Sequence, residues 1–178
     1  MLMRLRNRQQ GFTLIELLIV VAIIGIIAAL LIPNFLDALQ KSKQKRTEAD
    51  VKNLGTAMFS WLTDQAGAAS AGAAATGDVN LGNFQSTTST DLGTVLVSQY
   101  IQSIPLLDGW KHHYSFYMNY SNPLGGVNIM GILSYGRDGK PDTGSPDYTV
   151  TGFDPTDYDR DIVWADGYFV RYAQKTSG

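Results

Sequence analysis

The segment from residue 17 to residue 36 constrains this chain most, because none of its residues is charged. Most of them are Leu, Ile, Val or Ala. At about 1.5 Å per residue, a helix over these residues spans roughly 30 Å, the thickness of the hydrocarbon core of a bilayer. A helix that is apolar on every face is of little use in a soluble domain. The segment is therefore predicted to cross a membrane.

One acidic residue, Glu16, lies at the start of this apolar segment. A charged side chain inside the bilayer costs about 2.5–3.5 kcal/mol on insertion scales, so a positive partner at the same depth is expected. The residues before Phe12 include Arg4, Arg6 and Arg8 and no acid. Short cytoplasmic flanks are enriched in basic residues, so this end of the chain is predicted to face the cytoplasm.

Residues 11–16, GFTLIE, resemble the N-terminal signal of type IV pilins and of the pseudopilins of type II secretion. The resemblance implies that prepilin peptidase cleaves between Gly11 and Phe12, and that the new amine of Phe12 is then methylated. It also implies that Glu16 meets this amine in a neighbouring subunit of a helical filament.

Gly25 and Pro33 interrupt the apolar segment. Within the resembled family they bracket a stretch that can lose helix when subunits pack into the filament. Proline removes one helix hydrogen bond and glycine weakens a helix by up to about 1 kcal/mol. The residues alone are equally consistent with a mild kink and close helix packing.

Two other interpretations of the apolar segment fit its composition less well. A secretory signal peptide has an apolar core of about 7–15 residues and a small-residue cleavage site after it. The segment here is longer, has an acid near its start and lacks a clear A-x-A site. A plain single-pass anchor explains the length but not Glu16 beside Gly11 and Phe12. A filament subunit is favoured.

Beyond Pro33 the helix is expected to continue, because apolar residues recur at helical spacing from Val51 to Leu62. A basic cluster at residues 41–46 is expected to touch lipid headgroups before assembly, to touch acidic patches of adjacent subunits, or to be a solvated helix face. The predicted organisation is a cleaved leader over residues 1–11, a transmembrane and filament-core helix over 12–36, an amphipathic spine over 37–64 and a globular head over 65–178.

The predicted head combines one short helix with a few strands. Residues 66–91 are rich in Ala, Gly, Ser and Thr and are predicted to form an exposed loop. A short helix is expected over 91–101, with Asp91 as its cap. Strands are expected over residues 114–118, 128–135, 162–164 and 168–172. The fold class is therefore α+β: a long N-terminal helix packed on a small antiparallel sheet, with a C-terminal acidic loop.

Eight aspartates lie between Asp138 and Asp166, and only Lys140 and Arg160 oppose them. Carboxylates on a flexible loop suit Ca²⁺, which takes six to eight oxygen ligands at about 2.3–2.6 Å. The loop is not an EF-hand, because Ile162 and Tyr168 stand where a Gly and a Glu are needed. The alternative is a solvated acidic loop.

Residues 134–140, SYGRDGK, and residues 159–162, DRDI, resemble the calcium loop of the major pseudopilin of type II secretion. The turn at residues 108–110 is similar to one in the same family. The resemblance implies a structural Ca²⁺ held by the side chains of Asp138, Asp159 and Asp161 and the main-chain carbonyl of Tyr135.

No enzyme is predicted. His112 and His113 are adjacent, so on a strand they face opposite sides and cannot jointly hold a metal. No G-x-S-x-G motif surrounds Ser134. From Asp64 onward there are 12 acidic and six basic residues, which argues against nucleic acid as a partner. The chain has no cysteine, so no disulfide closes the head.

The expected function is that of a pseudopilus subunit in type II secretion. It would start in the inner membrane with its head outside the cytoplasm and end in a homo-oligomeric periplasmic filament. Its expected partners are prepilin peptidase, an inner-membrane assembly platform with its ATPase, minor pseudopilins and, before assembly, membrane lipid. The alternatives are a major subunit of a type IV pilus and a membrane-tethered calcium-binding module that never polymerises.

Overall fold

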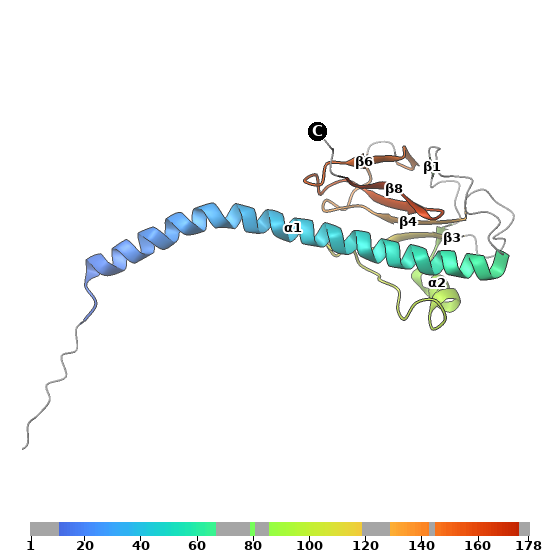
Figure 1. Ribbon diagram of the computed structural model, residues 1–178, viewed down its shortest axis with the longest axis horizontal. Helices are drawn as coiled ribbons and strands as arrows, with labels where there is room; N and C mark the ends of the chain where they lie inside the picture. The colour runs from blue at the N-terminus through green and yellow to red at the C-terminus, as the bar shows by residue number, and fades with distance from the viewer. Residues whose placement is uncertain (1–10, 67–78, 81–85, 119–128, 143–144, 175–178) are drawn as a thin grey trace, which may run out of the picture. The chain divides into compact units, whose positions relative to one another are not determined.

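The computed structural model describes residues 11–66, 79–80, 86–118, 129–142 and 145–174. The chain divides into two compact units, Met1–Ala38 and Leu39–Gly178. Figure 1 shows the long helix α1 (Leu14–Ala66), running from blue to green, and the strands after residue 114 in yellow to red.

Helix α1 covers Leu14–Ala66 and has Pro33 inside it. It is long and apolar enough to cross a membrane, and its most apolar stretch is not buried within the chain. The predicted start at Phe12 is two residues early. Thr13 occupies the cap position, where its Oγ1 accepts a hydrogen bond from the main-chain N–H of Glu16 at 3.3 Å.

The second unit contains a six-stranded sheet, a short helix and a separate pair of strands. The sheet has the order β2-β3-β4-β7-β8-β6. Its strands are β2 (Ser86–Thr87), β3 (Ser115–Met118), β4 (Met130–Ser134), β7 (Ile162–Ala165), β8 (Tyr168–Ala173) and β6 (Thr151–Phe153). Helix α2 covers Ser89–Leu96, and β1 (Val79–Asn80) pairs with β5 (Asp147–Tyr148).

The core of the second unit forms where the latter part of α1 packs against the sheet (Figure 1). The helix contributes the predicted periodic residues Val51, Leu54, Met58, Trp61 and Leu62, all of which are buried. The sheet contributes side chains such as Phe116, Ile132 and Trp164, and α2 adds Leu92 and Leu96. Gly55 allows the close approach, because a Cβ there would overlap the Trp164 ring. The α+β fold class is confirmed.

Two details of the predicted head are wrong. The sheet is mixed, because β6 runs parallel to β8 while the other pairs are antiparallel. Within the part of the chain that the structure describes, β1 and β2 fall in the predicted 66–91 loop, and β5 and β6 fall in the acidic loop. These strands have two or three residues each, which is too short for an alternating pattern to show.

Helix α2 is earlier and shorter than the prediction for residues 91–101. Its N-cap is Thr88, and Asp91 is the third helical residue of a capping box. Asp91 N–H donates to Thr88 Oγ1 at 3.2 Å, and Thr88 N–H donates to Asp91 Oδ2 at 3.3 Å. The helix ends at Leu96 because Val97 is extended and Ser98 has a positive φ of 78°.

Candidate functional site

The predicted cleavage site lies just outside the helix. Gly11, Phe12 and Thr13 have no regular secondary structure, and the Phe12 side chain is 81% exposed. A Cβ added at Gly11 would meet nothing within 4 Å. In the described chain, the Gly11–Phe12 peptide is therefore open to an approaching enzyme.

Glu16 forms a reciprocal cap with Thr13 at the start of α1. The main-chain N–H and the hydroxyl of Thr13 donate to Glu16 Oε2 at 2.9 and 2.7 Å. An anion here is also favoured by the positive end of the helix dipole. Among the described residues only Thr13 donates to this carboxylate, and both of its bonds end on Oε2. The second oxygen, Oε1, is therefore available to accept a hydrogen bond from an amine.

Gly25 and Pro33 both lie inside continuous helix. A Cβ at Gly25 would meet nothing within 4 Å, so the chain itself does not use this glycine for close packing. Near Pro33, the side-chain amide of Asn34 donates to the carbonyl of Leu30 at 3.2 Å. Loss of helix between Gly25 and Pro33 in a filament stays a prediction.

The four predicted calcium ligands are not gathered in one place. Both oxygens of Asp159 accept from Arg137, each at 2.7 Å, and this guanidinium lowers the pKa of Asp159. Asp138 is exposed, and its Oδ1 accepts the main-chain N–H of Lys140 at 3.0 Å. Tyr135 is half-buried beside the Leu133–Val163 cluster.

Asp161 is the predicted ligand that is fully buried. Its Oδ2 accepts from the Tyr148 hydroxyl at 2.5 Å and from the main-chain N–H of Asp142 at 2.9 Å. Burial raises the pKa of Asp161 to about 6. Its Oδ1 is buried without a hydrogen-bond partner, which is the one feature here that suits a missing ligand.

Within the described ranges, no group of three His, Cys, Asp or Glu side chains is placed to hold a metal ion. The residues present therefore do not fit the predicted calcium site as a set. Calcium binding stays a prediction that no contact in the described chain supports.

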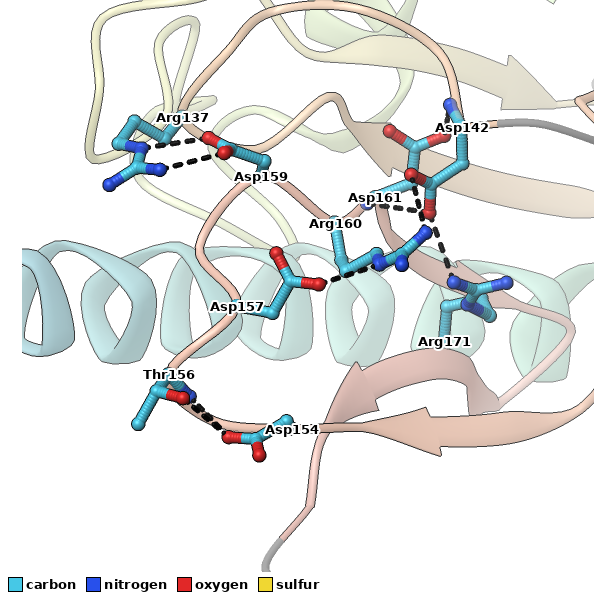
Figure 2. A network of polar contacts seen from close by, with 9 residues as sticks. All are labelled: Arg137, Asp142, Asp154, Thr156, Asp157, Asp159, Arg160, Asp161 and Arg171. Atoms are coloured by element: carbon cyan, nitrogen blue, oxygen red, sulfur yellow. Dashed lines mark hydrogen bonds and ion pairs between the residues drawn. The ribbon is translucent and has the colours of Figure 1, made fainter.

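The structure brings together Arg160 and Arg171 with Asp142, Asp157 and Asp161, and of these only Asp161 was predicted as a site residue (Figure 2). Asp142 Oδ2 accepts from Arg171 at 3.0 Å and from the main-chain N–H of Asp161 at 3.2 Å. Arg160 reaches Asp157 at 2.8 Å and Asp142 at 3.5 Å. In the sequence, these contacts could have been suspected from Arg137 and Arg171, which flank the acidic stretch from Asp138 to Asp166.

A second polar centre, at the 108–110 turn, is structural. Asp108 is 2% exposed, and its carboxylate accepts from the main-chain N–H groups of Trp110 and His112, each at 2.9 Å, and from Ser134 Oγ at 2.7 Å. The turn is tied to α1 because Trp110 Nε1 donates to Gln40 Oε1 at 2.7 Å. Ser134 is thus a buried donor to a carboxylate and not an exposed nucleophile.

Comparison with known proteins places the N-terminal features in a family. A family model for the prokaryotic N-terminal methylation motif matches residues 6–32, which include the cleavage site and Glu16. The type IV major pilin protein PilA of Myxococcus xanthus is 50% identical over 62 residues, 35% of this chain and 28% of the pilin.

Type II secretion system core protein G occurs among the relatives from several bacteria. The Dickeya chrysanthemi protein is 28% identical over 141 residues, 78% of this chain and 84% of that protein. The Escherichia coli protein is 34% identical over 62 residues, 35% of this chain and 43% of that protein. No solved structure matches the chain significantly.

The match covers less than half of the M. xanthus and E. coli relatives, and most of the D. chrysanthemi one. The long apolar helix and the small mixed sheet agree with the N-terminal motif. The chain is therefore similar to type IV pilins in its N-terminal part, and to core protein G of type II secretion systems over most of its length.

Proposed function

We propose that this chain is a structural subunit of a helical pseudopilus filament that drives type II protein secretion. One observation carries the proposal. The similarity to the D. chrysanthemi core protein G extends over 141 residues and so reaches into the head, whereas the match to M. xanthus PilA covers 62 residues.

The first step is processing at the membrane. Prepilin peptidase cleaves between Gly11 and Phe12, and the Phe12 amine is methylated. Before assembly the chain sits in the inner membrane, with α1 crossing it and the head outside the cytoplasm.

Assembly then replaces lipid around α1 with other copies of the same helix. Large apolar side chains on every face of α1, from Leu14 to Leu39, are exposed in the single chain. Contacts between unlike surfaces of successive copies, when they do not close into a ring, build a helical filament. Oε1 of Glu16 accepts a hydrogen bond from the charged Phe12 amine of a neighbouring copy. This ion pair neutralises both charges and sets the register between neighbouring helices.

The proposed partners follow from this cycle. They are further copies of this chain, prepilin peptidase, an inner-membrane platform with its ATPase, and minor pseudopilins. The work is mechanical, and no enzymatic activity is proposed for the chain itself.

A major subunit of a type IV pilus is the second candidate, and it rests on the 50% identity to M. xanthus PilA over the N-terminal 62 residues. A membrane-tethered module that never polymerises is the third. Such a module needs no cut after Gly11, so the mass of its membrane form would equal that of the precursor.

Deletion of the gene in its own host separates the first two candidates. A pseudopilus subunit predicts that exported enzymes accumulate inside the cell while surface pili remain visible by electron microscopy. Loss of pili with normal secretion would instead support the pilus candidate and contradict the proposal. Complementation with the wild-type chain is the control.

A further inference from the structure

We infer that Arg137, Arg160 and Arg171 hold the acidic C-terminal loop together in place of a divalent cation, so that the folded head needs no bound calcium. These three arginines form an arginine clasp with Asp142, Asp157, Asp159 and Asp161. Figure 2 shows the seven side chains, with the dashed contacts running between them.

The centre of the arginine clasp is the pair between Arg171 on β8 and Asp142. Arg171 Nη2 lies 3.0 Å from Asp142 Oδ2, and the two side chains are only 15% and 10% exposed. Water screens a shielded pair less than a surface pair, and removing one partner leaves the other charge shielded and unpaired. This contact ties the acidic loop to the sheet without a metal.

Main-chain N–H groups also stabilise the carboxylates of Asp142 and Asp161, as a bound cation would. Asp142 N–H donates to Asp161 Oδ2 at 2.9 Å, and Asp161 N–H donates to Asp142 Oδ2 at 3.2 Å. This reciprocal pair joins two segments that are 19 positions apart in sequence. The Tyr148 hydroxyl is a second donor to the same Asp161 oxygen, Oδ2. The two carboxylates are thus held together by N–H and O–H groups.

The outer contacts of the arginine clasp involve Asp157 and Asp159. Arg137 donates hydrogen bonds to both oxygens of Asp159 in a bidentate pair. Its Cζ lies 5.9 Å from the centre of the Tyr158 ring. Arg160 joins Asp157 to Asp142. These pairs are about half exposed at the arginine, so each contributes less than the Arg171–Asp142 pair.

The charge count leaves little for calcium to neutralise. The four carboxylates that belong to the arginine clasp are opposed by its three guanidinium groups, which leaves one negative charge over the clasp. A dication beside Asp142 would be repelled by Arg171 and Arg160, which already contact that carboxylate. Two buried atoms in the clasp have no hydrogen-bond partner, Asp161 Oδ1 and Arg171 Nε. The second is a donor, which a cation cannot satisfy.

The test compares calcium with arginine as the group that stabilises the loop. The intact mature chain in detergent micelles is unfolded by heat, with saturating calcium and with EGTA, and calcium binding is titrated directly by calorimetry. The inference predicts the same unfolding midpoint in both solutions and no saturable binding. A higher midpoint in calcium, together with saturable binding, would overturn it.

A second experiment compares two variants that each replace one arginine with methionine and so remove one positive charge. Arg171→Met should lower the midpoint by about 5–10 °C, because it removes the shorter and more shielded of the two arginine contacts of Asp142. Arg46→Met is the control: Arg46 is 69% exposed and lies 3.6 Å from Asp50, so the shift should stay below about 2 °C. Equal midpoints for Arg171→Met and wild type would contradict the clasp. If Arg171→Met does not fold, the calcium comparison on the wild-type chain still decides.

Discussion

Asp166→Ala should destabilise the head strongly, whereas Asp166→Asn should not. Asp166 lies in the β7–β8 turn, and its Oδ1 accepts the main-chain N–H groups of Ile129 and Met130 at 3.1 and 2.9 Å. Both of those residues are buried, so alanine would leave two buried donors without partners. Each unsatisfied group costs about 1–3 kcal/mol, which gives about 2–6 kcal/mol for the pair.

The backbone at Asp166 adds to this loss. Its φ is +46°, a left-handed conformation that Asn and Asp tolerate better than Ala. At about 2–4 °C per kcal/mol for a chain of this size, a loss near 4 kcal/mol lowers the unfolding midpoint by roughly 8–16 °C. Asparagine keeps both the acceptor oxygen and the turn, so Asp166→Asn should stay close to the wild-type midpoint.

The assay is thermal unfolding of the intact chain in micelles, followed by circular dichroism at several pH values. Burial raises the pKa of Asp166 above its ordinary value. The folded state then holds its proton more tightly than the unfolded state, so this contribution to stability is present at low pH and lost as pH rises through the raised pKa. Asp166→Asn removes that pH dependence. The unfolding midpoint of this variant should therefore rise relative to the wild-type midpoint as pH rises. Equal midpoints for the Ala and Asn variants would refute the reasoning.

Two further predictions concern the packing of the head on α1. Gly55→Ala should lower the unfolding free energy by about 1–3 kcal/mol, because the new methyl group overlaps the buried Trp164 ring; Gly93→Ala, with nothing within 4 Å, should instead raise it by up to about 1 kcal/mol through helix propensity. Denaturant titration measures both, and a stabilised Gly55→Ala would contradict the packing argument. Trp110→Phe removes the hydrogen bond to Gln40 and should cost about 1 kcal/mol or more, whereas an unchanged midpoint would mean that this bond does not anchor the turn.

Local patterns in the sequence predicted the helix and the main strands well. The helical period placed Val51, Leu54 and Met58 in the core, and the alternating residues at 114–118 predicted β3. Such signals repeat several times within one element, so a single exception does not hide them. Strands of two or three residues, such as β5 and β6, carry no repeat and were missed.

Contacts between distant segments could not be predicted in the same way. Arg137 meets Asp159 across 22 positions and Arg171 meets Asp142 across 29, and only the packing of the sheet brings them together. The sequence shows eight aspartates but not which of them face an arginine. The acidic count therefore suggested a cation, while the fold supplies guanidinium groups to three of these carboxylates, Asp142, Asp157 and Asp159.

The residues proposed for the N-terminal site are neighbours in sequence, so one short motif names them all, and their roles stay predictions. The hydrogen bonds from Thr13 to Glu16 were not predicted, although a Thr followed by a Glu three residues later is a capping-box pattern. The cap gives Glu16 a partner within its own chain before any other subunit arrives.

The most direct test of the filament proposal is the amount of assembled filament formed in cells by Glu16→Ala, with Thr13→Val as the matched control. Thr13→Val removes the side-chain half of the cap but keeps the carboxylate, whereas Glu16→Ala removes the group that is proposed to pair with the neighbouring Phe12 amine. Cleaved, membrane-inserted subunits should accumulate in both variants. Filaments should persist in Thr13→Val and be lost in Glu16→Ala; wild-type filament yield from Glu16→Ala would contradict the account.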